Sequence, residues 1–170
     1  MGFSSSTGFT SLEDLFVHQL NDLYDAEQQS LQFLPKMIDK ATSPDLRQAL
    51  TGHLHDTKQQ LARLEKSFHI MGLTLERVTC VAMKGLVTEG EEIIDARGDS
   101  DVVDAALIAA AQRMEHCEIA GYGTARSFAN QLGFNDIAKL LQQSLDEEGQ
   151  ADKELAEIAE QSASPVFISS

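Results

Sequence analysis

The sequence predicts an all-α protein, and three observations support this fold class. Proline occurs only at Pro35, Pro44 and Pro165 in the chain of 170 residues. Long stretches lack glycine, and the runs of alternating β-branched residues that are typical of strands are missing from the sequence. Apolar residues instead recur at steps of three and four, which places them on one face of a helix. We therefore expect long amphipathic helices joined by turns.

The first half of the chain predicts a helical hairpin. A first helix is expected over residues 12–40, because its apolar residues keep helical spacing and Ser11 provides an N-cap before an acidic first turn. Residues 41–44 contain a stop, a new cap and a proline suited to the first helical position. A second helix is therefore expected over residues 44–71, and the short loop makes the two helices antiparallel.

The second half predicts another hairpin after a long connection. Residues 73–100 have a weaker apolar pattern with several glycines, which predicts one short helix within a crossover. A third long helix is expected from a cap at Ser100 or Asp101 to residue 131, and a fourth over 135–161. Two hairpins joined by one crossover form a four-helix bundle, the arrangement of ferritin-like folds. We expect one domain and two polar tails, over residues 11–161, 1–10 and 162–170.

Composition limits the partners and the compartment. The chain has 13 basic and 27 acidic residues, a formal net charge of −14, and no basic run, which argues against nucleic acid and anionic membranes as partners. Its longest apolar stretch, residues 105–111, is too short to span a bilayer. The first residues lack the features of a secretion signal, and Cys80 and Cys117 have no metal-binding spacing. We therefore expect a cytoplasmic protein with two free thiols.

Acidic residues interrupt the apolar face of every predicted long helix. The polar residues on these inner rows are, in chain order, Glu27, His53, Asp56, Gln60, Glu115, Glu118, Glu148 and Asp152. Glu27 and Asp56 lie 29 residues apart across the first hairpin, and Glu118 and Glu148 lie 30 apart across the second. At a rise of about 1.5 Å per residue, the acids of each hairpin stand at one height. The sequence thus predicts several carboxylates converging inside the bundle.

A cation would resolve the repulsion among these carboxylates. No lysine or arginine lies on the inner rows to neutralise them, and unpaired buried charges are costly. Carboxylates with an imidazole suit iron, manganese or zinc, and glutamates on facing helices can bridge two such ions. Two alternatives remain open: a helix phase shifted by one residue would place the acids at the rim, and a protonated network with Gln60 and Tyr122 would need no metal.

Six stretches of the sequence carry a family resemblance that spans about residues 10 to 160. They are residues 12–18, 23–29, 80–86, 104–112, 115–124 and 145–152. The most specific is a core Glu-x-x-Glu at Glu115 and Glu118, followed by Ile-Ala-x-Tyr ending at Tyr122. These stretches resemble the ferritin-like stress proteins of the YciF/YciE type, a domain of unknown function.

The resemblance implies a ferritin-like bundle, usually dimeric, with a dinuclear iron or manganese site, or a zinc site, similar to those of rubrerythrin and manganese catalase. The implied ligands are Glu27, Asp56, Glu118 and Glu148, with Glu115, Asp152, His53 and Gln60 as further ligands or their supports. This sequence departs from the family at Asp56, where glutamate is usual, and at Cys117, where tyrosine is usual. It also lacks a histidine in the fourth helix.

Two functions follow from the sequence and the resemblance. The first is a stress-response protein whose dinuclear centre reacts with peroxide or oxygen, and Tyr24 or Tyr122 is then either a redox relay or an ordinary packed side chain. The alternative is a non-catalytic dimeric bundle with a degenerate metal site, acting through protein interaction. The short side chain of Asp56 and the scarcity of imidazoles favour the alternative. The sequence does not decide whether the protein is an enzyme.

Overall fold

The computed structural model describes residues 8–162, and every regular element in this range is a helix. The five helices are α1 (Leu12–Lys40), α2 (Pro44–Met71), α3 (Val81–Asp95), α4 (Ser100–Gln131) and α5 (Asn135–Ser162). The all-helical prediction is confirmed, and the predicted bounds of the four long helices agree with the structure to within two residues. Of the two predicted tails, residues 1–7 and 163–170 lie outside the described residues.

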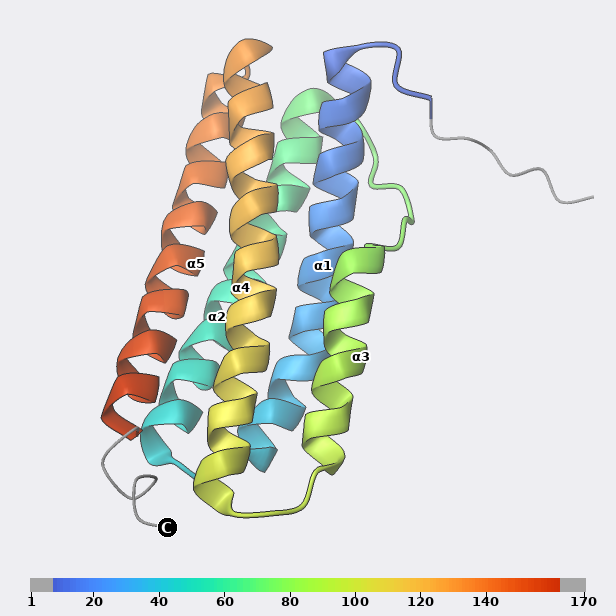
Figure 1. Ribbon diagram of the computed structural model, residues 1–170. Helices are drawn as coiled ribbons and strands as arrows, with labels where there is room; N and C mark the ends of the chain where they lie inside the picture. The colour runs from blue at the N-terminus through green and yellow to red at the C-terminus, as the bar shows by residue number, and fades with distance from the viewer. Residues whose placement is uncertain (1–7, 163–170) are drawn as a thin grey trace, which may run out of the picture.

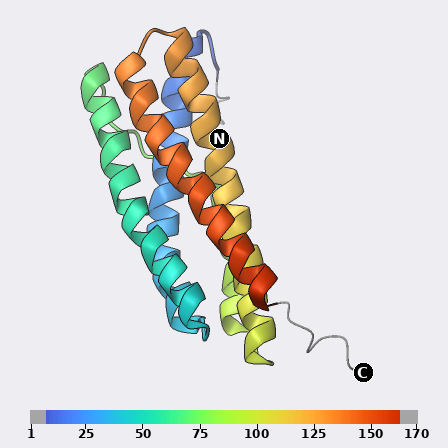
Figure 2. The same ribbon diagram turned by 90° about the vertical axis from the view of Figure 1, so that its left-hand side faces the viewer.

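The four long helices pack side by side around one interior. Contacts join α1 to α2, α2 to α5, α5 to α4, and α4 to α1, and Figure 2 shows α5 lying between α2 and α4. The short helix α3 packs on the outside, against α1 and α4 (Figure 1). The connection from α2 to α4 passes along α1 and carries the chain to the opposite end of the bundle, as the predicted crossover requires.

The helix ends carry the groups that the sequence indicates, with one correction. The side chains of Ser11 and Ser43 cap α1 and α2, and Gly72 ends α2 with a left-handed φ of 67°. The N-cap of α4 is Asp99, and not Ser100 or Asp101 as predicted, because the Asp99 carboxylate accepts hydrogen bonds from the next turn. The helix itself still begins at Ser100.

A polar layer divides the core into two apolar clusters. One cluster is centred on Phe33, Met37 and Leu107, and the other on Phe16 and Phe68. Between them the inner rows of the four long helices bury a set of polar and charged side chains. We call this set the polar layer: Glu27, Ser30, His53, Thr57, Gln60, Glu115, Glu118, Ser144 and Glu148.

Asp104 is a buried acid outside the polar layer and is not among the residues predicted from the sequence. Its carboxylate accepts hydrogen bonds from the Thr42 and Ser43 backbone N–H groups at 2.9 and 2.7 Å, and from the Thr42 hydroxyl at 2.7 Å. Asp104 therefore ties the turn between α1 and α2 to the first turns of α4. Charge-assisted hydrogen bonds of this kind are among the stronger ones in proteins.

Replacing Asp104 by alanine is expected to destabilise the protein by about 2–3 kcal/mol, because three donors lose a charged acceptor in a half-buried turn. Chemical denaturation followed by circular dichroism measures this loss. The matched control is Asp101→Ala, which removes an exposed acid from the same end of α4 and should cost less than about 1 kcal/mol. Equal losses in the two variants would contradict the role given to Asp104.

Three polar side chains of α1 hold the crossover against the bundle. Asn21 accepts a hydrogen bond from the backbone N–H of Glu76 at 2.8 Å, and Asp25 accepts one from the backbone N–H of Cys80 at 2.7 Å. Gln29 donates to the Cys80 carbonyl at 3.2 Å. These three residues recur every four positions, so they lie on one side of α1. Their side chains supply hydrogen-bond partners for backbone groups of Glu76 and Cys80, which lie in the non-helical segment before α3.

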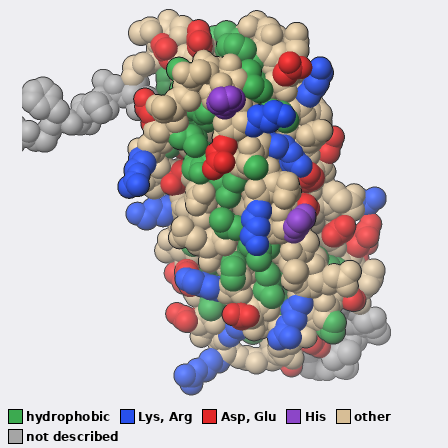
Figure 3. Space-filling view, turned by 180° about the vertical axis from the view of Figure 1, so that it is seen from behind, with side chains coloured by type: hydrophobic (Ala, Val, Ile, Leu, Met, Phe, Trp, Pro, Cys, Tyr) green, Lys and Arg blue, Asp and Glu red, His purple; other side chains and the backbone are tan. Residues whose placement is uncertain are grey.

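The outer surface is polar and mixed in charge. Figure 3 shows lysine and arginine side chains interspersed with aspartate and glutamate on the face in view, with apolar side chains between them. In the described part of the chain, no helix is long and apolar enough to cross a membrane.

Candidate metal centre

The polar layer brings potential metal ligands together from three helices. His53 of α2, Glu115 and Glu118 of α4, and Glu148 of α5 each offer one ligand atom, and these four atoms lie within 4.8 Å of one another. All four side chains are buried. Glu115 and Glu118 reach the same place because residues three apart share one face of a helix.

Hydrogen bonds from neighbouring polar groups fix one oxygen of three carboxylates. The Ser30 hydroxyl donates to Glu118 Oε1 at 2.8 Å, and Gln60 Nε2 donates to Glu148 Oε1 at 2.5 Å. The Tyr122 hydroxyl likewise donates to Glu27 Oε1 at 2.5 Å, which brings the acid of α1 to the edge of the group. The donors come from α1, α2 and α4, so the packing of the whole bundle orients these carboxylates.

Several buried polar atoms of the layer have no hydrogen-bond partner among the described residues. They are Glu27 Oε2, His53 Nδ1, Gln60 Oε1, Glu115 Oε2, Glu118 Oε2 and Glu148 Oε2. His53 Nδ1 lies 3.4 Å from Glu115 Oε2. So many unpaired atoms in one buried layer are exceptional, since buried polar groups are nearly always hydrogen-bonded.

Burial changes the protonation of the layer. It raises the pKa of Glu27 to about 8, despite the opposing hydrogen bond from Tyr122. Burial, with repulsion from neighbouring acids, holds the pKa values of Glu118 and Glu148 well above the usual range. Burial lowers the pKa of His53 to about 4, so its imidazole is neutral at pH 7 and cannot balance the carboxylates. Without a metal, the layer must therefore retain protons.

The pair Glu115 and Glu148 is close enough to share one of these protons. Burial raises the pKa of Glu115, and the acids around it add to the rise. The interaction with Glu115 further raises the pKa of Glu148, so the two neighbouring carboxyl groups do not ionise together. The metal-free layer thus resembles the protonated network that the sequence analysis left open.

Two of the predicted site residues lie outside the layer. Asp56 is only half-buried, because the inward positions of α2 are His53, Thr57 and Gln60. Partial burial, together with repulsion from Glu147 on α5, raises the pKa of Asp56. Asp152 is also half-buried and accepts a hydrogen bond from Gln112 at 3.0 Å. The prediction that both acids belong to the interior is therefore wrong.

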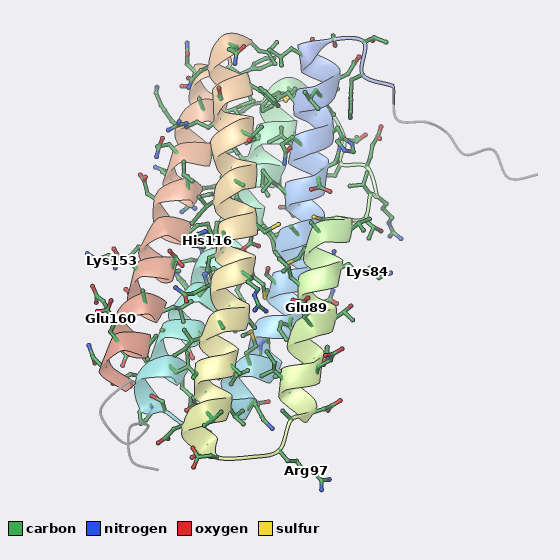
Figure 4. The ribbon with its side chains drawn as sticks, viewed as in Figure 1. Lys84, Glu89, Arg97, His116, Lys153 and Glu160 are labelled. Carbon is green, nitrogen blue, oxygen red and sulfur yellow. The ribbon has the colours of Figure 1, made fainter. Side chains whose placement is uncertain are left out.

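The surroundings of Asp152 are solvent-accessible. Its carboxylate lies 3.2 Å from His116 Nε2, and the His116 side chain is 66% exposed. Figure 4 shows His116 on α4 at the side facing α5. Near Asp56, Arg63 pairs with both oxygens of Glu147 at 2.6 and 2.5 Å, so this arginine is already engaged by an acid outside the layer.

The structure separates the two tyrosines and adds three hydroxyl residues to the site. Tyr122 is fully buried against Glu27, whereas Tyr24 donates to Glu65 at 3.0 Å in a more exposed place. Ser30, Thr57 and Ser144 lie in the layer and are not among the site residues predicted from the sequence. Their signal was present in the sequence, since each small polar residue stands on an otherwise apolar helix face.

The chain is similar in sequence to a known family and to a protein of Escherichia coli. Residues 11–165 match the family described as a domain of unknown function (DUF892). The chain is 42% identical to the protein YciF of Escherichia coli (strain K12) over 150 residues, which covers 88% of this chain and 90% of that protein.

Solved structures agree with the sequence match. The crystal structure of the E. coli stress protein YciF gives a TM-score of 0.88 at 41% identity and covers 91% of this chain and 98% of its own. The protein YcfI of Rhodopseudomonas palustris gives 0.85 at 43% identity with the same coverage. A protein of Xanthomonas campestris pv. campestris, at 19% identity, gives 0.70 over 88% of this chain and 91% of its own, and supports the fold alone.

Proposed function

The chain belongs to the DUF892 family, and we propose that it is a ferritin-like stress-response protein whose polar layer holds a dinuclear iron or manganese centre. One observation carries the proposal. Four glutamates and a neutral histidine meet in a buried layer, and each presents an unpaired ligand atom. The E. coli relative is described as a stress protein, which supports the first part of the proposal.

The donor set fits such a metal. Carboxylate oxygens and an imidazole nitrogen suit iron and manganese, and facing helices of ferritin-like bundles supply ligands of this kind. His53, Glu115, Glu118 and Glu148 would hold the metal, and Glu27 would complete a second position. A metal would also displace the protons that burial now keeps on the carboxyl groups, because carboxylates bind metals in their ionised form.

The remaining residues of the site would orient the ligands and exclude water. Ser30, Gln60 and Tyr122 each hold one oxygen of a carboxylate and leave the other free. Hydrogen-bonded supports of this kind commonly change metal affinity by about 10- to 100-fold. The apolar clusters on both sides shield the layer from solvent. When bound, two ions of iron or manganese supply one-electron redox chemistry toward peroxide or oxygen.

Metal uptake tests the proposal directly. Protein grown in ordinary medium is analysed for bound elements, then stripped with a chelator and titrated with Mn(II), or with Fe(II), while calorimetry follows binding. We expect about two ions per chain and a rise in Tm of about 5–10 °C at saturating metal. Uptake of no ion and an unchanged Tm with iron, manganese and zinc would contradict the proposal.

A non-catalytic dimeric bundle remains the second candidate function, and one observation favours it. The layer contains a single histidine, and Asp56, the acid expected from α2, lies outside it. The carboxyl groups of the polar layer can also be kept uncharged by protons that neighbouring acids share, without a metal. In this alternative the layer binds no metal, and the protein acts through its outer surface. The metal titration separates the two functions, because only the first predicts stoichiometric uptake.

A further inference from the structure

The two cysteines of the chain meet beside the polar layer. Cys80 and Cys117 lie 37 positions apart in the sequence, yet both side chains pack in the same apolar cluster. Their thiols interact closely enough that the pKa of Cys80 is raised and the pKa of Cys117 is lowered. Both are free thiols, and Cys80 is buried while Cys117 is half-buried. Asp22 of α1 adds to the rise in the pKa of the Cys80 thiol. The pair therefore occupies the junction of α1, α3 and α4, with one thiol partly open to solvent.

The backbone holds the two thiols in this position. Cys80 directly precedes α3, and its N–H and carbonyl groups are bonded to Asp25 and Gln29 of α1. Cys117 lies in the middle of α4, a helix of 32 residues. α3 packs directly on α4, and both cysteines pack in the same apolar cluster. Their contact thus belongs to the packed structure and does not depend on two mobile loops.

The same junction covers one wall of the polar layer. Cys117 is the neighbour of Glu118, and Met83 in the first turn of α3 is fully buried. The Met83 sulfur lies 3.9 Å from the Ser30 hydroxyl, which in turn donates to Glu118. Figure 4 shows Lys84, the next residue, pointing away from the bundle, so α3 turns its sulfur-bearing side inward. A bond between the cysteines would fix this cover to α4.

We propose that Cys80 and Cys117 form an oxidation site at which a hydroperoxide converts the dithiol into an intramolecular disulfide. The sulfur of half-buried Cys117 attacks one peroxide oxygen, the O–O bond breaks, and Cys117 becomes a sulfenic acid as the first water leaves. The Cys80 sulfur then attacks the Cys117 sulfur, the S–O bond breaks, and the second water leaves with the Cys80 proton. In total, two thiols are oxidised by two electrons, and one hydrogen peroxide is reduced to two waters.

The oxidation of metal-free protein tests this proposal independently of the metal centre. Reduced, chelator-treated protein is exposed to a small excess of hydrogen peroxide, and its thiols are counted in denaturant. We expect two thiols before and none after, a mass loss of about 2 Da, and one proteolytic peptide pair that a dithiol reductant separates. The disulfide closes a loop of the chain between Cys80 and Cys117, which should raise the Tm by about 5–10 °C, and reduction should reverse this rise.

Two single variants provide matched controls. Cys80→Ser and Cys117→Ser each retain one thiol and should show neither the internal cross-link nor the rise in Tm. Survival of both thiols in the natural chain would overturn the proposal. A cysteine that gains oxygen in the mass spectrum without forming a cross-link would also overturn the proposal. A disulfide between two chains, seen on a non-reducing gel, would do the same. The peptide map of the natural chain needs no variant, so the test stands even if a serine variant fails to fold.

Discussion

Replacing Glu118 and Glu148 together by glutamine is expected to abolish metal uptake and to stabilise the metal-free protein. The variant loses two of the four grouped ligand side chains, so the affinity for Mn(II) should fall by well over 100-fold. Glutamine keeps the oxygen that accepts from Ser30 or Gln60, and its amide can donate to a neighbouring carboxylate.

The gain in stability comes from removing two groups that resist ionisation in the folded protein. Both carboxyl groups have pKa values raised by burial, so each costs free energy at a pH where the unfolded chain ionises freely. We expect the Tm of the metal-free variant to be about 5–10 °C higher at pH 8, with unchanged helix content. Calorimetry and circular dichroism measure both quantities.

The matched control removes two exposed acids from α5, by Glu154→Gln and Glu157→Gln. This variant makes the same change in formal sequence charge outside the layer, and it should keep metal uptake and change the Tm little. Unfolding of the Glu118 and Glu148 variant would mean that charged carboxylates hold the bundle together, which the proposed site does not allow. Full metal uptake by it would place the metal elsewhere.

The metal-free protein is expected to lose stability as the pH rises from 6.5 to 8. In this window the unfolded chain has ionised Glu27, whose usual pKa is 4.5, whereas the folded protein still holds the proton until about pH 8. The folded state thus binds more protons, and each such group lowers the unfolding free energy by about 1.4 kcal/mol per pH unit. Glu115, Glu118 and Glu148 shift in the same direction.

His53 acts in the opposite direction, but at lower pH. Its pKa of about 4 in the folded protein, against 6.5 as usual, makes stability rise with pH between these two values only. Above pH 6.5 the four buried carboxyl groups outweigh the opposite effect of Cys117, whose pKa is lowered to about 7, and we expect the Tm to fall by about 10 °C up to pH 8.

Calorimetry of chelated protein at several pH values measures this slope. In the variant with glutamine at Glu118 and Glu148, the Tm should fall less steeply with pH. The Mn(II)-loaded protein should not lose stability as the pH rises, because metal binding releases the protons from the buried carboxyl groups. A Tm that rises between pH 6.5 and 8 in the metal-free protein would show that the layer is already ionised.

The helices could be predicted from the sequence because their signals are local. Ser11, Pro44 and Gly72 mark helix ends through their own side chains or backbone, whatever they pack against. The hydrogen bonds of Asp104 could not be found in this way, because its partners lie some 60 residues earlier in the chain. The hydrogen bonds by which Asn21 and Asp25 hold the crossover could not be predicted for the same reason.

The site could be predicted in part, and its errors come from helix phase. Glu27, Glu118 and Glu148 fall in the layer because each stands between apolar residues at clear steps of three and four. On α2 the apolar pattern is weaker, and a rotation of 100° per residue is enough to turn Asp56 out and leave His53 and Gln60 in. The meeting of Cys80 with Cys117 depends on where the crossover lies, which no local pattern specifies.

The polar layer also has a consequence for the alignment of the helices. Leucine and alanine faces pack almost equally well when one helix slides along another by a turn, about 5.4 Å. Such a slip would press Glu148 or Glu118 against an apolar cluster and separate each from its hydrogen-bond donor. Buried polar groups can select one axial register in this way, as they do in coiled coils, at a cost in stability. The acids that weaken the metal-free bundle therefore also determine which bundle forms.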